Sequence, residues 1–111
     1  RLMEPRNLLS GIPRISEGEA FEELLACHNV SIERIVSAPG ALSEVFEQTQ
    51  DEWVLILQGS AKLKLDNRIH DLSQGDSLFI PAHAPHQVLE TSESPLCTWL
   101  AVHIHPLNDT P

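Results

Sequence analysis

The chain has 111 residues, of which 41% are hydrophobic and 21% charged, as is typical of a single folded domain. Sixteen acidic and seven basic residues give a formal net charge of -9. This excess of negative charge argues against binding to nucleic acids or anionic membrane surfaces, because both need clustered lysine and arginine. No apolar run reaches the length of about 18 residues that spans a bilayer, and no signal-peptide pattern opens the sequence. We therefore expect a cytoplasmic protein.

The two cysteines, Cys27 and Cys97, lie far apart in the sequence and form no CxxC pair. In a cytoplasmic protein we expect both thiols to be reduced. A single disulfide between them remains compatible with the sequence.

Residues 1–29 are expected to form an N-terminal arm followed by a short helix. The residues before Ser16 show no clear period. From Ser16 to Cys27, a capping serine, Glu19 three positions later and apolar side chains on one helical face predict a helix of a few turns.

From residue 30 onward the apolar residues alternate with polar ones, a period of two that is typical of β-strands. Turn-forming glycine, proline, asparagine and serine residues separate the alternating segments. The predicted strands are 30–37, 52–58, 61–65, 68–72, 77–80, 86–91 and 96–105. Short strands joined by tight turns predict an antiparallel sandwich or barrel over residues 30–105, with a C-terminal tail of residues 106–111.

Two segments of this region carry a pair of spaced motifs. Glu52 is followed by six residues and then Gly59, and Gly75 is followed at fixed spacing by Pro81 and His86. These segments resemble the two motifs of the cupin superfamily, and the chain is similar to small single-domain bacterial cupins over about residues 30–105. The resemblance implies an all-β fold, a cupin-type antiparallel jelly-roll barrel, here preceded by the short N-terminal helix.

The sequence departs from the cupin pattern at the positions that usually hold a metal ion. The two histidines of the first motif are replaced by Phe46 and Gln48. Phenylalanine cannot bind a metal, and a glutamine amide is a poor substitute for imidazole on a transition metal. The resemblance therefore implies Glu52 and His86 as ligands of a divalent ion (zinc, iron, manganese or nickel), with Gln48 as a weaker ligand. His103, on the last predicted strand, is a candidate to supply the missing imidazole.

Alternate residues of a barrel strand point inward, so apolar neighbours of the candidate ligands should line a pocket. The expected pocket residues are Phe46, Val54, Ile56 and Val88. Each polar residue also has a structural interpretation: Glu52 as a hydrogen-bonded acid at a strand start, and His86 and His103 as histidines bonded within the fold. The remaining histidines are expected at the barrel mouth or the surface: His28, His70, His83 and His105.

Three large apolar residues of the strand 52–58, Trp53, Leu55 and Leu57, should point away from the barrel interior. Such a set on an outer face suggests cover by another sheet or a second subunit. Together with the resemblance, it predicts a homodimer.

Three functions remain open from the sequence. The first is a metal-dependent enzyme acting on a sugar or small acid, in which the ion serves as a Lewis acid or dioxygen site. The second is a non-enzymatic module that binds a small-molecule ligand in the barrel. The third is a structural dimer module without a ligand. In the absence of metal, Glu52 and His86 could still act as a general acid and base.

Overall fold

The computed structural model describes residues 4–107, which form eight β-strands and no helix. The strands are β1 (Glu19–Cys27), β2 (Val30–Ser37), β3 (Asp51–Gln58), β4 (Ser60–Leu65), β5 (Arg68–Ser73), β6 (Ser77–Ile80), β7 (His86–Thr91) and β8 (Thr98–Ile104). Within these residues, accordingly, no helix is long and apolar enough to cross a membrane.

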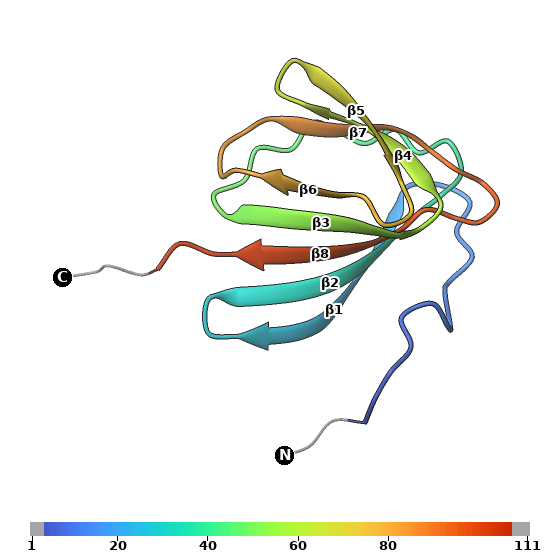
Figure 1. Ribbon diagram of the computed structural model, residues 1–111, viewed down its shortest axis with the longest axis horizontal. Coiled ribbons are helices and arrows are strands. Elements are labelled where there is room, and N and C mark those ends of the chain that lie inside the picture. The colour runs from blue at the N-terminus through green and yellow to red at the C-terminus, as the bar shows by residue number, and fades with distance from the viewer. Residues whose placement is uncertain (1–3, 108–111) are drawn as a thin grey trace.

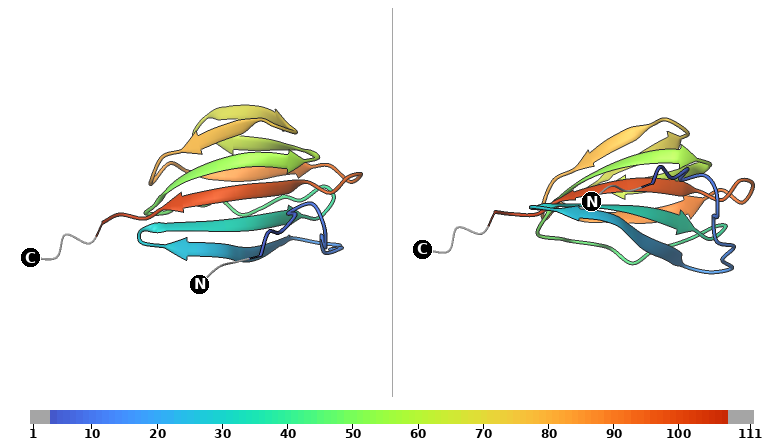
Figure 2. Two further views of the ribbon diagram at one scale, coloured as in Figure 1. Left: turned by 60° about the horizontal axis from the view of Figure 1, so that its bottom comes forward. Right: turned by 90° about the horizontal axis from the view of Figure 1, so that it is seen from below.

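The strands form two sheets that face each other, as Figures 1 and 2 show. The larger sheet has the order β1-β2-β8-β3-β6, and the smaller sheet has the order β5-β4-β7. Every pair of neighbouring strands is antiparallel. The predicted all-β jelly-roll barrel is confirmed.

Alternation along the strands places the apolar core between the two sheets. On β3, Glu52, Val54 and Ile56 are 6%, 4% and 1% exposed, whereas the residues between them are only half-buried. Leu63 of β4 and Val88 of β7 close the core from the smaller sheet. Burying side chains of this size stabilises the fold by about 2 kcal/mol each. The inward orientation that the sequence predicts for β3 is therefore confirmed.

Gly59 joins β3 to β4 at a point where no other residue fits. Its φ of +80° lies in the left-handed region that favours glycine. A Cβ atom at this position would lie 2.9 Å from the Cα atom of Cys97 and 2.6 Å from Ser92 Oγ. The glycine that closes the first motif is thus required by both the turn and the close approach of the chain after β7.

The predicted helix over Ser16–Cys27 is wrong, because Glu19–Cys27 forms β1 instead. This segment pairs with β2 from end to end, with Glu19 opposite Ser37 and Cys27 opposite Val30. A helix cap contributes about 1 kcal/mol, which is a small term beside the backbone hydrogen bonds and side-chain contacts of a whole paired strand. The capping pattern at Ser16 was therefore a local signal that strand pairing overrides.

Both cysteines are free, Cys27 at the exposed end of β1 and Cys97 in the core. Burial raises the pKa of the Cys97 thiol to about 12, so this side chain is a neutral, buried group. Cys27 and Cys97 are therefore not joined by a disulfide, which was one of the two states compatible with the sequence.

The outer face of β3 carries Trp53, Leu55 and Leu57, all half-buried. Trp53 lies opposite Phe79 of β6, which is 50% exposed. The homodimer expected through this face stays a prediction, since the structure describes one chain.

The N-terminal arm is held on the outer face of the larger sheet by a buried arginine. Arg34 of β2 is only 4% exposed. Its guanidinium donates hydrogen bonds of 2.9, 3.0 and 3.2 Å to the backbone oxygens of Leu8, Ser10 and Gly11. It also forms an ion pair of 3.0 Å with Glu22 of β1. One side chain thus joins the arm to two strands.

Arg34→Ala should lower the free energy of unfolding by about 2–4 kcal/mol, because several buried charge-assisted hydrogen bonds are lost together. Urea unfolding measures this change, and hydrogen exchange should become faster at residues 8–11. The control is Arg14→Ala, which removes an exposed arginine from the same arm. Equal losses in the two variants would contradict an anchoring role for Arg34.

Candidate functional site

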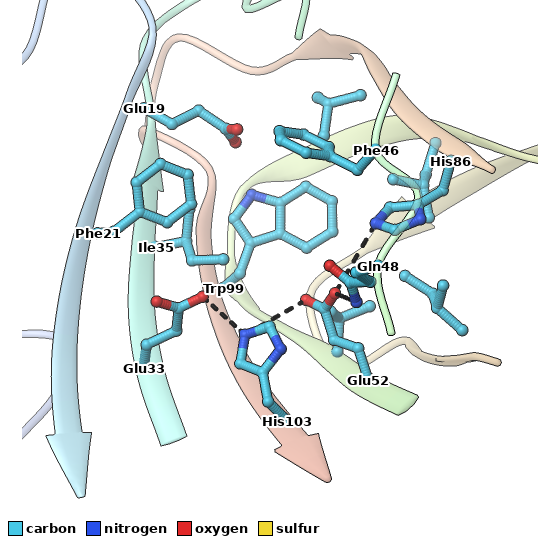
Figure 3. A pocket seen from close by; sticks show the side chains of 14 residues that line it. Glu19, Phe21, Glu33, Ile35, Phe46, Gln48, Glu52, His86, Trp99 and His103 are labelled. Atoms are coloured by element: carbon cyan, nitrogen blue, oxygen red, sulfur yellow. Dashed lines mark hydrogen bonds and ion pairs between the residues drawn. The ribbon is translucent and has the colours of Figure 1, made fainter. Parts of the chain in front are cut away.

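A cavity of about 90 Å³ lies between the two sheets, and Figure 3 shows it from close by. Its walls come from every strand except β5 and from the segment that precedes β3. The apolar lining residues are Phe21, Ile35, Phe46, Val54, Leu63, Ile80, Val88 and Trp99. The polar lining residues are Glu19, Glu33, Gln48, Glu52, His86 and His103. The cavity is therefore mostly apolar, with a few polar groups that converge on it.

Glu52 is the buried carboxylate of this cavity. It is the second residue of β3, where alternation turns its side chain inward, and it lies opposite Ile80 of β6 and His103 of β8. Its Oε1 atom accepts a hydrogen bond of 2.7 Å from Gln48 Nε2. No hydrogen bond among the described residues uses Oε2, which faces the cavity.

His86 begins β7 and approaches Glu52 from the other sheet. Its backbone pairs with Phe46, with N–H···O distances of 2.8 and 3.0 Å, and this bridge fixes where the imidazole lies. The ring Nδ1 donates a hydrogen bond of 3.1 Å to the backbone oxygen of Ala84. In the neutral ring, Nε2 then carries a lone pair. Nε2 lies 3.8 Å from Glu52 Oε1, which is too long for a hydrogen bond.

His103 lies on the opposite side of Glu52. Its Nε2 atom donates to Glu33 Oε1 at 2.8 Å, and its Nδ1 atom accepts from the Gln50 amide at 3.2 Å. The hydrogen bond to Glu33 is the main cause that raises the pKa of His103 above the usual range for histidine. The distance from His103 Nε2 to Glu52 Oε2 is 4.0 Å.

The structure brings together most of the residues that the sequence predicts for the site. Glu52, His86, Gln48 and His103 all line the cavity, as do the predicted pocket residues Phe46, Val54 and Val88. The roles that the sequence assigns to them stay predictions.

Ile56 was predicted as a pocket residue, but it is not among the residues that line the cavity. It points inward like Val54, but it lies further along β3, opposite Trp99, and is 1% exposed in the core. The inward positions of one strand thus serve the cavity at one end and the core at the other.

Several lining residues were missed from the sequence. Glu19 lies on the segment predicted as a helix, and a helix there gives it no position in the barrel. Its Oε2 accepts a 2.6 Å hydrogen bond from Ser37 Oγ, which itself accepts from Trp99 Nε1 at 3.0 Å. Burial is the main cause that raises the pKa of Glu19. Glu33 could have been found from its alternation with Arg34 along β2, but the sequence alone did not show which face is inward.

The other histidines lie away from the cavity. His28, His83 and His105 are exposed, and His70 is half-buried on β5. His83 adopts a φ of 70° in the turn before β7. None of these four lines the cavity.

The polar residues of the cavity do not fit a three-histidine metal site. Over residues 4–107, no group of three or more histidine, cysteine, aspartate or glutamate side chains could hold a metal ion. His86 Nε2 and Glu52 face each other, whereas His103 Nε2 is bonded to Glu33 and Gln48 turns its amide nitrogen to Glu52. Two facing ligand atoms, from His86 and Glu52, are fewer than the three protein ligands of a typical catalytic zinc site.

The arrangement offers two bases in an apolar setting. The Glu52 carboxylate and the neutral His86 imidazole can each accept a hydrogen bond or a proton from a bound molecule. The 3.8 Å between them leaves room for one donor atom within hydrogen-bond distance of both.

The pair of His103 and Glu33 makes stability depend on pH. A folded-state pKa above the unfolded value of about 6.5 means that the pair stabilises the fold fully below that pH, and this contribution is lost as the pH rises through the folded-state pKa. We expect the unfolding free energy of wild type, relative to that of Glu33→Gln, to fall as the pH rises from about 6.5 through the higher folded-state pKa of His103. Urea unfolding across this range tests it, and a difference independent of pH would contradict it.

Comparison with known proteins gives a consistent result. A sequence profile of the cupin domain matches residues 34–103. No curated protein matches the chain in sequence.

Solved structures resemble the chain over nearly its whole length. A protein from Ralstonia eutropha JMP134, provisionally named as a mannose-6-phosphate isomerase, is 34% identical, with a TM-score of 0.85 over 94% of this chain and 100% of that chain. A cupin superfamily protein from Desulfitobacterium hafniense is 25% identical, with a TM-score of 0.81 over 96% of this chain and 94% of that one. Oxalate decarboxylase from Bacillus subtilis, a protein with Mn(II) centres, is 22% identical, with a TM-score of 0.72 over 83% of this chain and 26% of that one.

Proposed function

This chain belongs to the cupin domain family, and from that premise we propose that its barrel binds a small polar molecule between His86 and Glu52. One observation carries the proposal. His86 Nε2 and Glu52 Oε1, both acceptors, face each other at 3.8 Å, and the bond that Oε1 accepts from Gln48 leaves His86 Nε2 without a donor among the described residues. An N–H or O–H group of a ligand placed about 2.9 Å from both atoms would satisfy them together.

Burial of these two residues supports the proposal. Glu52 is 6% exposed and His86 is 7% exposed, so bulk water solvates neither of them fully. Burying a carboxylate is costly unless its oxygens are paired, and within the described residues Glu52 has a single hydrogen-bond partner, Gln48. A ligand that donates to Glu52 would therefore gain more here than at an exposed carboxylate.

The lining of the cavity also limits the class of ligand. The Ralstonia protein is provisionally named for an activity on a phosphorylated sugar. Phosphate groups are usually held by arginine, lysine or helix N-termini. No lysine or arginine lines this cavity, and three glutamates do. We therefore propose an uncharged or cationic ligand for this chain, in place of a sugar phosphate or a small acid.

A metal-dependent enzyme is the second candidate. The 3.8 Å between His86 Nε2 and Glu52 Oε1 is compatible with two ligands that each lie about 2.1 Å from one ion. A divalent ion held in this way would take its remaining ligands from solvent or substrate. This geometry is the observation that keeps the zinc, iron, manganese or nickel prediction open.

Thermal unfolding with a panel of small polyols, amines and carboxylic acids tests the proposal. A ligand at ten times its Kd should stabilise the wild type by about 1.4 kcal/mol, which raises Tm by several degrees. His86→Ala should lose this shift because one of the two acceptors is gone. The control is His70→Ala, which removes a half-buried histidine outside the cavity and should keep it.

Elemental analysis of the same proteins separates the two candidates. Stoichiometric metal in the wild type that is lost in His86→Ala would favour the metal-dependent enzyme. If no compound of the panel stabilises the wild type more than it stabilises the His86→Ala variant, the proposed binding site is overturned.

A further inference from the structure

We propose that the ligand of this cavity is a small organic cation whose N–H groups donate to Glu52 and His86, such as a primary ammonium or an amidinium. The inference rests on the proposed binding function and names the chemical class of the ligand. It stands on three features of the cavity: its charge, its free acceptors and its aromatic walls.

The charge of the cavity is negative. Glu19, Glu33 and Glu52 line it, and no lysine or arginine does. The basic residue between two lining positions of β2, Arg34, points to the other face of the sheet, where it holds the N-terminal arm. The three carboxyl groups outnumber the two imidazoles of the lining, His86 and His103, which are its only groups that could carry a positive charge.

The free polar atoms of the cavity are mainly acceptors. Gln48, His86, Trp99 and His103 each already donate an N–H group to a protein acceptor. The polar atoms that remain free are carboxylate oxygens and the lone pair of His86 Nε2. The Gln48 amide adds its second N–H and its oxygen. Such a set matches a ligand rich in donors, and it repels an anion.

Two of these acceptors lie on side chains that are more than nine-tenths buried. The Glu52 and His86 side chains are 8% and 7% exposed. No hydrogen bond in the described part of the chain uses Glu52 Oε2 or His86 Nε2. Every fully buried side-chain polar atom there has a partner, so these two atoms are open to the space of the cavity that both residues line. The acidic residues therefore form a recess with open, aimed acceptors, unlike a solvated acidic surface.

Aromatic rings surround the same space. Figure 3 shows the Trp99 indole in the middle of the lining, with Phe21, Phe46 and the carboxylates of Glu19 and Glu52 around it. The face of an aromatic ring attracts a cation, and tryptophan does so most strongly. The indole N–H is bonded to Ser37, which holds the ring in place. Carboxylates beside aromatic faces favour a cation with a short apolar chain.

The test compares three probes of similar size, ethanolammonium, ethylene glycol and glycolate. Each has a hydroxymethyl group, and they differ in the second group, which is an ammonium, a hydroxyl or a carboxylate. The Trp53→Phe variant leaves Trp99 as the only tryptophan, so its fluorescence reports binding in the cavity. We expect ethanolammonium to bind about tenfold more tightly than ethylene glycol, and glycolate to bind most weakly. Added salt should reduce the preference for the cation.

A charge-neutral variant isolates the cause of the preference. Glu52→Gln, made in the Trp53→Phe background, keeps the shape of the side chain and should reduce the preference for ethanolammonium to about twofold or less. Glu90→Gln removes an exposed carboxylate of β7 outside the cavity and should keep the tenfold preference. Thermal unfolding checks that each variant is folded.

Two outcomes would overturn the inference alone. Ethylene glycol that binds as tightly as ethanolammonium, or an undiminished preference in Glu52→Gln, would show binding in the cavity without selection for a cation. If none of the three probes changes the fluorescence of Trp99, both the inference and the proposed binding function fail.

Discussion

The site depends on one buried carboxylate that the two sheets of the barrel enclose. Glu52 is inward because it alternates with Trp53 along β3, and its place beside His103 follows from the pairing of β3 with β8. Its cost of burial is offset by Gln48 on one oxygen, while the approach of His86 from the smaller sheet leaves a gap of 3.8 Å. A fully bonded carboxylate would make this a structural ion pair. In the proposed function, this gap is where a ligand binds.

The residues at the motif positions of the cupin family lie together in this chain, but some of them differ in chemistry from the usual metal ligands. Phe46, Gln48, Glu52 and His86 converge on one cavity, as their places in the two motifs imply. Phe46 supplies a ring beside His86, with centroids 5.7 Å apart, in place of a metal-binding nitrogen. His103 adds an imidazole, but its hydrogen bond to Glu33 directs Nε2 away from Glu52. The barrel therefore keeps the architecture of its family, and under the proposed function its polar groups bind a donor of the ligand directly.

Much of this arrangement could be predicted from the sequence, where short-range patterns decide the outcome. The alternation along β3 predicted that Glu52 and Val54 point inward, and the spacing of the second motif predicted the place of His86. Two features depended on distant parts of the chain. The segment Glu19–Cys27 has helix-like local signals but pairs with β2. On β2, Glu33 faces the cavity because Arg34 on the opposite face is covered by the N-terminal arm. No local pattern could show which face the arm would cover, so the acidic character of the cavity became visible only in three dimensions.

The account rests on His86 Nε2, which presents a lone pair to the cavity when Nδ1 carries the ring proton. Nitrogen-15 NMR of the histidine rings, assigned with His86→Ala, measures directly which ring nitrogen carries the proton. For the neutral ring, the account predicts a protonated Nδ1, bonded to Ala84, and a bare Nε2 whose resonance moves when a donor ligand is added. A proton found on Nε2 together with a bare Nδ1 would mean that the ring donates toward Glu52. His86 Nε2 would then be a donor, and the two facing acceptors described here would not exist.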